Sequence, residues 1–391
     1  MVGYTAGDRL VFTLDGRIDT NNATECGEQI MKAVAENPSL PVTVDCDGLN
    51  YISSAGLRNL MKLKKAVSDT VLVNVQPQVY DILETTGFTE LMEVRKQLRT
   101  ISVEGCQVIG KGANGTVYRI DKETIVKTFK PGCDISDIDR ERRLARTAFV
   151  MGIPTAISYD VVKVEGGGYG SVYELLDASN LAKELNSGRK SLDEIVALEV
   201  DLLKTIHSKE VNPDQIPPFK DKARLWVDFD KDHIPANKYA KLCRLVDAIA
   251  DSNHMIHGDF HLKNIMYQND ECLLIDMDSL SHGNPVFEFA NIWCTYVGLG
   301  EVEPEVVYAF LDIPFDKAIK IWRKTLERYF DTTDETRIRE IEDKIRVLGY
   351  ARIIRRCIRK NRIATDSGRK EYDNAVRSIC ELLDRVDDLA L

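Results

Sequence analysis

The chain has 391 residues, which is more than one hydrophobic core usually organises, so we expect at least two domains. Hydrophobic residues make up 44% of the sequence and charged residues 29%, a composition that excludes a fibrous or largely disordered protein. The formal net charge of -10 disfavours a general nucleic-acid binder.

No uninterrupted apolar run approaches the roughly 20 residues that a membrane-spanning helix needs, and the first residues lack the pattern of a signal peptide. We therefore expect a cytoplasmic protein without a membrane span. The nine cysteines occur singly, with no close pair that would indicate a zinc or redox motif, and we expect them to be reduced.

The first part of the chain alternates strand-like and helix-like segments. The predicted strands are Leu10–Leu14, which ends at Asp15-Gly16, Pro41–Cys46 and Thr70–Val75. The predicted helices are Asn22–Ala35, Gly56–Val67 and Val79–Thr86. This alternation predicts a compact α/β domain over residues 1–98. A new pattern begins near Ile101 with the strand-like segment 102–110, so a second domain is predicted over residues 99–391.

A glycine-rich motif opens the second domain. Gly110, Gly112 and Gly115 fit the pattern G-x-G-x-x-G-x-V, which lies here between two strand-like segments. That context favours a kinase-type flap over a dinucleotide-binding turn, because glycines let the backbone approach phosphates and offer N–H groups. A glycine-rich hairpin without a ligand is the structural alternative.

A lysine and a glutamate follow the motif. Lys127 lies in the predicted strand Thr124–Phe129, where a kinase lysine contacts the α- and β-phosphates of ATP. Lys130 is the competing lysine, but it lies beside a proline at the end of that strand. Glu141, in the predicted helix Asp137–Val150, is the candidate partner of Lys127, with a solvated helix glutamate as the alternative.

The most specific signal is the segment 257–264, His-Gly-Asp-Phe-His-Leu-Lys-Asn, followed by an apolar strand that ends at Asp276. Phosphoryl transfer needs a carboxylate that orients the attacking hydroxyl, and oxygen ligands that hold Mg²⁺ against the phosphates. Asp259 fits the first role, and Asn264 and Asp276 fit the second. Asp278 either assists at the metal or caps the following turn.

These motifs resemble the aminoglycoside phosphotransferase and choline kinase branch of the protein-kinase-like fold, whose loop reads H-G-D-x-H-x-x-N. The resemblance covers roughly residues 103–385. It implies an α+β, two-lobed kinase-like domain, with the N-lobe at about 99–176 and the C-lobe at about 177–391. It also implies ATP and Mg²⁺ as cofactors, Asp259 as the catalytic base, and Asn264 and Asp276 as metal ligands.

The same resemblance assigns further residues. It places Lys127 on the phosphates and the segment 173–176 at the adenine, with Glu174 and Leu176 as contacts. It puts His261 where protein kinases carry a lysine near the γ-phosphate. His257 is expected to support the loop by hydrogen bonds rather than to transfer a proton.

The class of phosphate acceptor can be inferred from the short segment that follows Asp278. The segment 285–290, Pro-Val-Phe-Glu-Phe-Ala, comes soon after Asp278 and resembles the family's G-x-P-x-x-D-L-A, with Glu288 in place of Asp. No room is left for the long segment with which protein kinases generally dock a peptide, so a small hydroxylated acceptor is favoured.

The first domain resembles the STAS fold of bacterial anti-sigma factor antagonists over residues 1–98. The resemblance rests on residues 16–23 before a helix, and on the strand 44–46 that leads into Tyr-Ile-Ser-Ser-Ala-Gly-Leu at 51–57. It implies Ser54 as a phosphoacceptor. A helix N-terminus suits a phosphate because of its free N–H groups and dipole. The alternative is that Ser53 and Ser54 only cap the helix.

Residues 352–362 put apolar side chains on one helical face and arginines and a lysine around the other. In an acidic chain this face could receive an anionic substrate or an acidic partner, although a solvated basic face is the simpler interpretation.

The sequence therefore predicts a Mg²⁺-ATP-dependent phosphotransferase with a small-molecule hydroxyl acceptor, regulated by or coupled to a STAS domain. The alternative is a partner-switching signalling protein that binds a sigma-regulatory protein. In that case the kinase fold would serve as a nucleotide sensor or as a protein-serine kinase acting on Ser54.

Overall fold

A computed structural model describes residues 2–112 and 115–391 of the chain. The chain divides into two compact units, one made of Met1–Glu104 with Val161–Gly170 and the other of Gly105–Asp160 with Ser171–Leu391.

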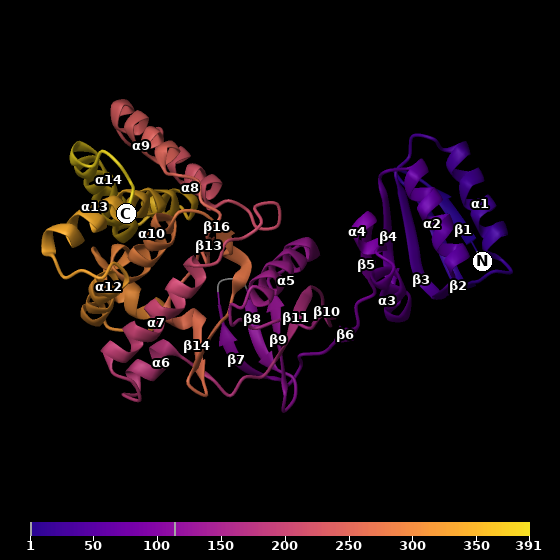
Figure 1. The fold of residues 1–391 in the computed structure, drawn as a ribbon, viewed down its shortest axis with the longest axis horizontal. Helices are drawn as coiled ribbons and strands as arrows, with labels where there is room; N and C mark the ends of the chain where they lie inside the picture. Colours follow the sequence, from indigo (N-terminus) through magenta and orange to yellow (C-terminus); the bar gives the residue numbers. More distant parts are fainter. Residues whose placement is uncertain (1, 113–114) are drawn as a thin grey trace. The chain divides into compact units, whose positions relative to one another are not determined.

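The first unit is built on a five-stranded sheet of order β1-β2-β3-β4-β5. β1 is antiparallel to β2, and the remaining neighbours are parallel because helices connect them. The strands are Val2–Ala6, Leu10–Ile18, Val42–Ile52, Thr70–Val75 and Glu93–Lys96. The helices α1 to α4 are Ala23–Glu36, Ser54–Ala66, Pro77–Thr85 and Phe88–Leu91. Figure 1 shows α1 and α2 side by side on this sheet.

The α/β alternation of this unit is as predicted, but one boundary was wrong. The pair Asp15-Gly16 does not end β2, which continues to Ile18. Gly16 has a φ of +79°, and the register against β3 shifts on both sides of it, so the glycine forms an irregularity inside the strand. The edge strands β1 and β5 were not predicted.

The second unit begins with antiparallel strands joined by hairpin turns. β7 (Gln107–Lys111), β8 (Gly115–Arg119) and β9 (Thr124–Phe129) pair in sequence, and β11 (Tyr169–Glu174) lies next to β9. The strand predicted from residue 102 starts only at Gln107, because Gly105, with a φ of +73°, forms a turn before it. α5 (Ile135–Val150) follows β9. The short strand β6 (Thr100–Ile101) pairs in parallel with β10 (Asp160–Val164).

Beyond β11 the chain is mainly helical, as predicted. Helices α6 to α14 are Leu181–Asn186, Leu192–His207, Phe219–Asp228, Ala236–Ala248, Pro285–Tyr296, Pro304–Leu311, Phe315–Tyr329, Glu335–Arg359 and Asp366–Arg385. Five short strands lie among them: β12 (Ser179–Asn180), β13 (Met255–Ile256), β14 (Ile265–Gln268), β15 (Glu271–Leu274) and β16 (Ser281–His282). Figure 1 shows α10, α13 and α14 packed together, with the short strands nearer to the antiparallel strands β7, β8 and β9.

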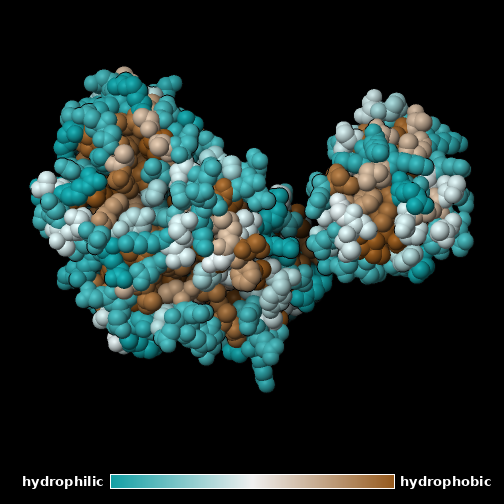
Figure 2. Space-filling model, viewed as in Figure 1, coloured by the Kyte–Doolittle hydropathy of each residue, from teal (hydrophilic) through white to brown (hydrophobic). Residues whose placement is uncertain are grey.

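Each unit has its own hydrophobic core. In the first, Phe12, Val44 and Leu72 of neighbouring strands are fully buried. In the second, α10 is buried almost all round, with Trp293 and Tyr296 at 0% exposure. Hydrophilic residues cover most of the visible surface of both units (Figure 2). Among the described residues, no helix is both long and apolar enough to cross a membrane.

Candidate active site

The glycine-rich motif occupies the connection between β7 and β8, and the amide of Gly112 donates to the carbonyl of Gly115 over 2.9 Å. A Cβ at Gly115 would lie 1.8 Å from the carbonyl oxygen of Thr128, so only glycine fits beside β9. Among the described residues, no atom lies within 4 Å of a Cβ built at Gly112. Ala113 and Asn114, which complete the motif, lie outside the described residues.

Lys127 joins three elements of the second unit. Its ammonium lies 2.9 Å from Oε1 of Glu141 on α5 and 2.7 Å from Oδ1 of Asp276. Burial lowers the pKa of Lys127, but the two carboxylates outweigh burial and raise it overall, so the lysine stays charged. Burial raises the pKa of Glu141, and Lys127 offsets part of that rise. The competing lysine, Lys130, is exposed.

Asp259 and Asn264 are held together by the fold of their loop. The side-chain amide of Asn264 donates to the Asp259 carbonyl over 2.9 Å and lies 3.5 Å from its Oδ2. The amide of Ile275 donates to the Asn264 carbonyl over 3.0 Å, which places the end of β15, and hence Asp276, beside Asn264. Asp276 itself has a φ of +65°, which turns the chain sharply after the strand.

Glu288 and His257 hold this loop in place through hydrogen bonds. Glu288 is fully buried and accepts hydrogen bonds from the amides of His257 (2.5 Å) and Gly258 (2.9 Å). Burial raises its pKa, but His207, His257 and the His257 amide outweigh burial and hold the pKa below its usual value. Nδ1 of His257 accepts from the Asp259 amide over 3.2 Å, so its Nε2 is free to donate to the Ile275 carbonyl at 3.3 Å.

A second buried connection reaches the loop from α7. The Tyr296 hydroxyl accepts from the Leu262 amide over 3.1 Å and donates to Oε1 of Glu199 over 2.8 Å. Thr325 donates to the other oxygen of this carboxyl over 3.3 Å. Burial raises the pKa of Glu199 to about 7. Sequence reasoning missed Glu199, although it interrupts the apolar face of α7 four residues after Ile195 and four before Leu203.

His261 is buried beside the catalytic loop. Its Nε2 lies 3.8 Å from Oδ2 of Asp259, and its ring meets the edge of Phe310 at a centroid distance of 5.1 Å. Burial lowers its pKa to about 4, so the imidazole is neutral near pH 7. The side chain therefore offers hydrogen bonds, and not a fixed positive charge, next to Asp259.

The oxygen-rich end of β15 fits a magnesium ion. Asn264 uses its amide nitrogen towards Asp259, which leaves its side-chain oxygen as the atom suited to a cation. The pKa of Asp278 is raised by burial and by the nearby negative charge of Asp276, so the two carboxyl groups lie close together. No cluster of three or more His, Cys, Asp or Glu suited to a metal occurs in residues 2–112 and 115–391. A resident ion would therefore draw on Asn264, Asp276 and ligand oxygens.

β11 ends at Glu174, and residues 175–178 connect it to β12. Tyr173 points inward, where burial raises the pKa of its phenol to about 12. The Leu175 amide donates to the Glu123 carbonyl over 2.6 Å. Glu174, the last residue of β11, is exposed, and Leu176 is partly buried. These are the two residues that the sequence assigned to adenine.

Models of two protein families match the chain. The STAS domain model matches residues 4–101, and the model described as the phosphotransferase enzyme family matches residues 105–318, more than half of the chain. The chain belongs to the phosphotransferase enzyme family. This confirms the predicted fold class, with an α/β STAS domain before a kinase-like domain, and the predicted class of enzyme.

Solved structures agree with this fold. A thermostable mutant of the aminoglycoside phosphotransferase APH(4)-Ia in ternary complex with AMP-PNP and hygromycin B is 11% identical. Its TM-score is 0.50, and the match covers 72% of this chain and 94% of that one. A mutant of the same enzyme with ADP and hygromycin B is also 11% identical, with a TM-score of 0.50 and coverage of 78% and 97%. No curated protein sequence matches the chain.

In the STAS domain, the two serines at the start of α2 occupy different positions relative to the helix. Ser53 is the N-cap residue, and its hydroxyl accepts from the Gly56 amide over 3.4 Å. Ser54 is the first residue of the helix, and its side chain is exposed. The capping function therefore belongs to Ser53, and Ser54 is left at the surface of the helix N-terminus.

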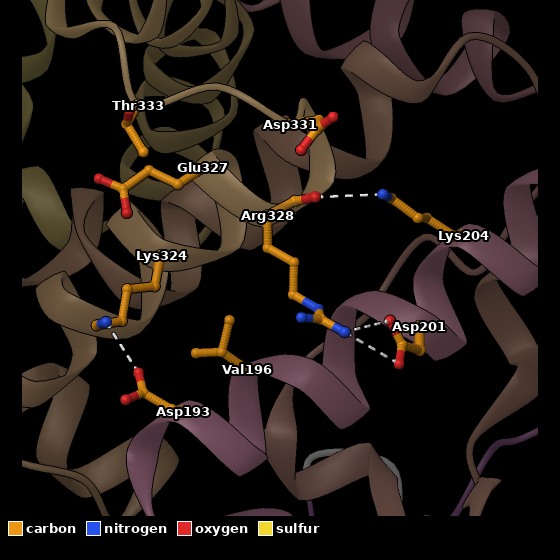
Figure 3. A pocket seen from close by; sticks show the side chains of 9 residues that line it. All are labelled: Asp193, Val196, Asp201, Lys204, Lys324, Glu327, Arg328, Asp331 and Thr333. Carbon is orange, nitrogen blue, oxygen red and sulfur yellow. Dashed lines mark hydrogen bonds and ion pairs between the residues drawn. The ribbon is translucent and has the colours of Figure 1, made fainter.

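The phosphotransferase domain also has a surface groove of about 590 Å³ between α7 and α12 (Figure 3). Several of its charged side chains bond to one another across the groove. Lys324 pairs with Asp193 at 2.8 Å, Arg328 pairs with Asp201 at 3.0 Å, and Lys204 donates to the Arg328 carbonyl. None of the proposed catalytic residues lines this groove, and we assign it no ligand.

Proposed function

We propose that the chain is an ATP- and Mg²⁺-dependent phosphotransferase that phosphorylates a hydroxyl group of a small-molecule acceptor. The observation that carries the proposal is the position of Lys127, in contact with both Glu141 and Asp276 while Asp276 lies beside Asn264 and its partner Asp259. Packing alone gives no reason for a buried lysine to bridge two carboxylates next to a third. In this proposal residues 1–98 form the STAS domain and residues 99–391 the kinase-like domain, with its lobes dividing near residue 176.

The nucleotide-binding groups in this proposal are those that the family resemblance assigns. The Glu174 carbonyl and Leu176 amide bind the adenine edge, and the backbone of Gly110, Gly112 and Gly115 covers the phosphates. Lys127, fixed in its charged form, supplies a positive charge to them. Asn264 and Asp276 would hold Mg²⁺, which neutralises phosphate charge when it is bound.

Asp259 orients the acceptor. Its carboxylate accepts a hydrogen bond from the acceptor hydroxyl and takes the proton as the hydroxyl oxygen bonds to the γ-phosphorus. The bond from that phosphorus to the β–γ bridging oxygen breaks, and ADP leaves. The loop amides fixed by Glu288 keep Asp259 in place, and neutral His261 donates or accepts a hydrogen bond beside it.

The structural neighbours support the acceptor class. Both complexes of APH(4)-Ia contain hygromycin B, a small molecule, together with a nucleotide. Only Asp278 and a few further residues separate Asp276 from α10, which begins at Pro285, so no long peptide-docking segment follows the site.

The test is a screen of hydroxylated metabolites and peptides with labelled ATP and Mg²⁺. Purified protein should bind ATP and transfer label to a small hydroxyl compound, and Asp276→Ala should abolish transfer while the fold is kept. A wild-type protein that neither binds ATP nor releases ADP with any acceptor would overturn the proposal.

The exposure of Ser54 favours a second candidate function, in which the STAS domain binds a sigma-regulatory protein and responds to phosphorylation. A phosphate at Ser54 would meet the free amides of the α2 N-terminus and would add a charge of about -2 to that surface. The kinase-like domain would then act as a nucleotide sensor or would phosphorylate Ser54. A pull-down with wild type, Ser54→Ala and Ser54→Asp should recover a partner whose binding differs between the last two.

Intact-mass analysis separates the two forms of this candidate. If the kinase-like domain phosphorylates Ser54, incubation with Mg²⁺ and ATP adds one phosphate to wild type and none to Ser54→Ala or Asp259→Asn. If the same mass is gained by Asp259→Asn, the chain is not its own kinase.

A further inference from the structure

Two helices of the phosphotransferase domain bring a row of cations over a row of aromatic rings. Lys222 lies over Phe219 (5.3 Å to the ring centroid) within α8. Two arginines of α13 continue the row, because Arg352 lies 5.8 Å from the centroid of Trp226 and Arg355 lies 5.7 Å from that of Phe229. We call Lys222, Arg352 and Arg355 the basic ladder.

The ladder follows helical spacing in both elements. Phe219, Lys222, Trp226 and Phe229 are three or four residues apart in α8 and its C-cap, and so share one face of that helix. Arg352 and Arg355 are likewise three apart in α13, and exposed Arg359 follows one turn later. The basic face that the sequence showed at residues 352–362 is thus turned in part towards α8.

The ladder begins at the catalytic loop. The ring of Phe219 comes within 3.1 Å of a Cβ built at Gly258, the residue before Asp259. The Lys222 ammonium donates to the Ser279 carbonyl over 3.0 Å and to the Ser281 hydroxyl over 3.1 Å, a few residues after Asp276. Lys222 therefore contacts the segment after Asp276, and along α8 it precedes the two rings that the arginines contact.

Within residues 2–112 and 115–391, neither Arg352 nor Arg355 forms an ion pair with a carboxylate, and Arg352 instead hydrogen-bonds to the thiol of Cys294. Arg356, next in sequence to Arg355, pairs with Glu371, and Arg346 of the same helix pairs with Asp343. In contrast, Nε of Arg355 is buried and has no hydrogen-bond partner in the part of the chain that the structure describes. Burial, and then the like charges of Arg359 and Arg352, lower the pKa of Arg355. An external anion would relieve this repulsion.

The cation–π contacts occupy none of the N–H donors of the arginines. A guanidinium beside an aromatic ring can therefore still donate hydrogen bonds to a carboxylate or phosphate. Seven residues separate Lys222 from Phe229, which is about 10 Å along the helix axis. A molecule of the size of a hexose phosphate spans this distance.

We propose that the acceptor of the phosphotransferase is an anionic hydroxyl compound, whose phosphate or carboxylate group binds the basic ladder while its hydroxyl faces Asp259. This rests on the proposed function and names its substrate class. Sugars and amino sugars without an acidic group lack the charge that the ladder recognises.

The test uses four pyranose probes that differ mainly in charge: glucose 6-phosphate, glucuronate, glucose and glucosamine. Each is titrated into the full chain in the presence of Mg²⁺ and AMP-PNP, and the Kd is measured by calorimetry. At least one anionic probe should bind tenfold or more tightly than glucose and glucosamine, and this preference should weaken as salt is added. The two anions distinguish a phosphate ligand from a carboxylate ligand.

Arg352→Gln and Arg355→Gln should each weaken binding of the preferred anion about tenfold, and Arg355→Lys should keep part of it. Arg339→Gln is the matched control, because Arg339 is an exposed arginine of the same helix outside the ladder, and it should change the Kd less than twofold. The thermal unfolding of each variant shows whether it is folded.

Three results would overturn the inference: equal or tighter binding of glucose or glucosamine, anion binding that both glutamine variants retain in full, or no binding of either anion. Binding of hexaglutamate without binding of a hexose anion would assign the ladder to an acidic protein partner instead. The affinity for AMP-PNP is measured in the same titrations. Loss of AMP-PNP binding contradicts the proposed function, whereas loss of anion preference with intact AMP-PNP binding contradicts only the acceptor class.

Discussion

At the scale of single residues, the site combines one fixed cation with carboxylates that differ in their surroundings. Lys127 is buried between Glu141 and Asp276, and its charge is stabilised by both. Asp259 is about one third exposed and is held through its backbone by His257 and Asn264. Its side chain is thus accessible to an acceptor while its position is fixed by buried neighbours.

Asp259→Asn should lower the rate of phosphoryl transfer by about 10²–10⁴-fold, because the amide cannot take the proton of the acceptor hydroxyl. The affinity for ATP should stay within about twofold, since the base acts mainly in the transition state. Transfer is measured by ADP release and nucleotide affinity by titration. A large loss of ATP binding would mean that Asp259 serves the nucleotide instead.

Glu199 makes stability depend on pH. Its pKa is about 7 in the folded chain and near 4.5 in the unfolded one, so between these values the folded state binds the extra proton. The free energy of unfolding that Glu199 controls is therefore highest below about pH 4.5 and falls by about 3 kcal/mol as pH rises to 7.

Other buried carboxyls titrate in the same range, so the prediction concerns the difference between wild type and Glu199→Gln. Urea unfolding at several pH values should show a smaller fall for Glu199→Gln than for wild type between pH 5 and 7. Parallel curves for the two proteins would show that Glu199 keeps its charge on folding.

At the scale of elements, hydrogen bonds connect the catalytic loop to α10 and, through α10, to α7. Glu288 of α10 holds the amides of His257 and Gly258, and Tyr296 of the same helix links Leu262 to Glu199 of α7. Glu288 stands where the family pattern has Asp, and it makes two loop contacts through its own two oxygens. The longer side chain is thus compatible with the support that the loop needs.

Tyr296→Phe should remove one buried acceptor and one buried donor, which costs about 1–3 kcal/mol of unfolding free energy because the Leu262 amide and Glu199 lose their partner. It should also lower kcat several-fold with ATP affinity unchanged, since Leu262 lies in the loop that carries Asp259. Tyr308→Phe is the control, because Tyr308 is 57% exposed on α11. A Tyr296→Phe protein with wild-type kcat would show that the loop is held without this link.

The sequence predicted those parts of the site that lie close together along the chain. The spacing from Asp259 to Asn264 and then to Asp276 is set by one loop and one short hairpin, so their proximity could be inferred from local structure. The ion pair of Lys127 with Asp276 joins residues 149 positions apart and was not predicted. The hydrogen bond between Glu199 and Tyr296 was not predicted either, because how α7 and α10 approach each other depends on the packing of the whole core. The basic face of α13 was found, but α8 as its neighbour was not.

At the scale of the whole molecule, the residues that the structure describes form two hydrophobic cores with no member in common. One consists of buried residues between Leu10 and Met92, and the other of buried residues between Leu144 and Leu389. Because cooperative unfolding follows the core, each unit can unfold as its own transition. The nucleotide site proposed above draws only on residues of the second unit.

Calorimetric heating of the full chain should therefore show two transitions, of which only one responds to nucleotide. AMP-PNP with Mg²⁺ at 100 times its Kd stabilises the folded state that binds it by about 2.7 kcal/mol. For a domain of this size that corresponds to a rise in Tm of about 5–10 °C. Asp276→Ala should abolish this rise, because Asp276 is a proposed metal ligand, while Ser54→Ala should leave it unchanged. If one transition is seen, or if both rise together with nucleotide, the STAS domain and the phosphotransferase domain are energetically coupled, and regulation of one by the other then has a direct physical route.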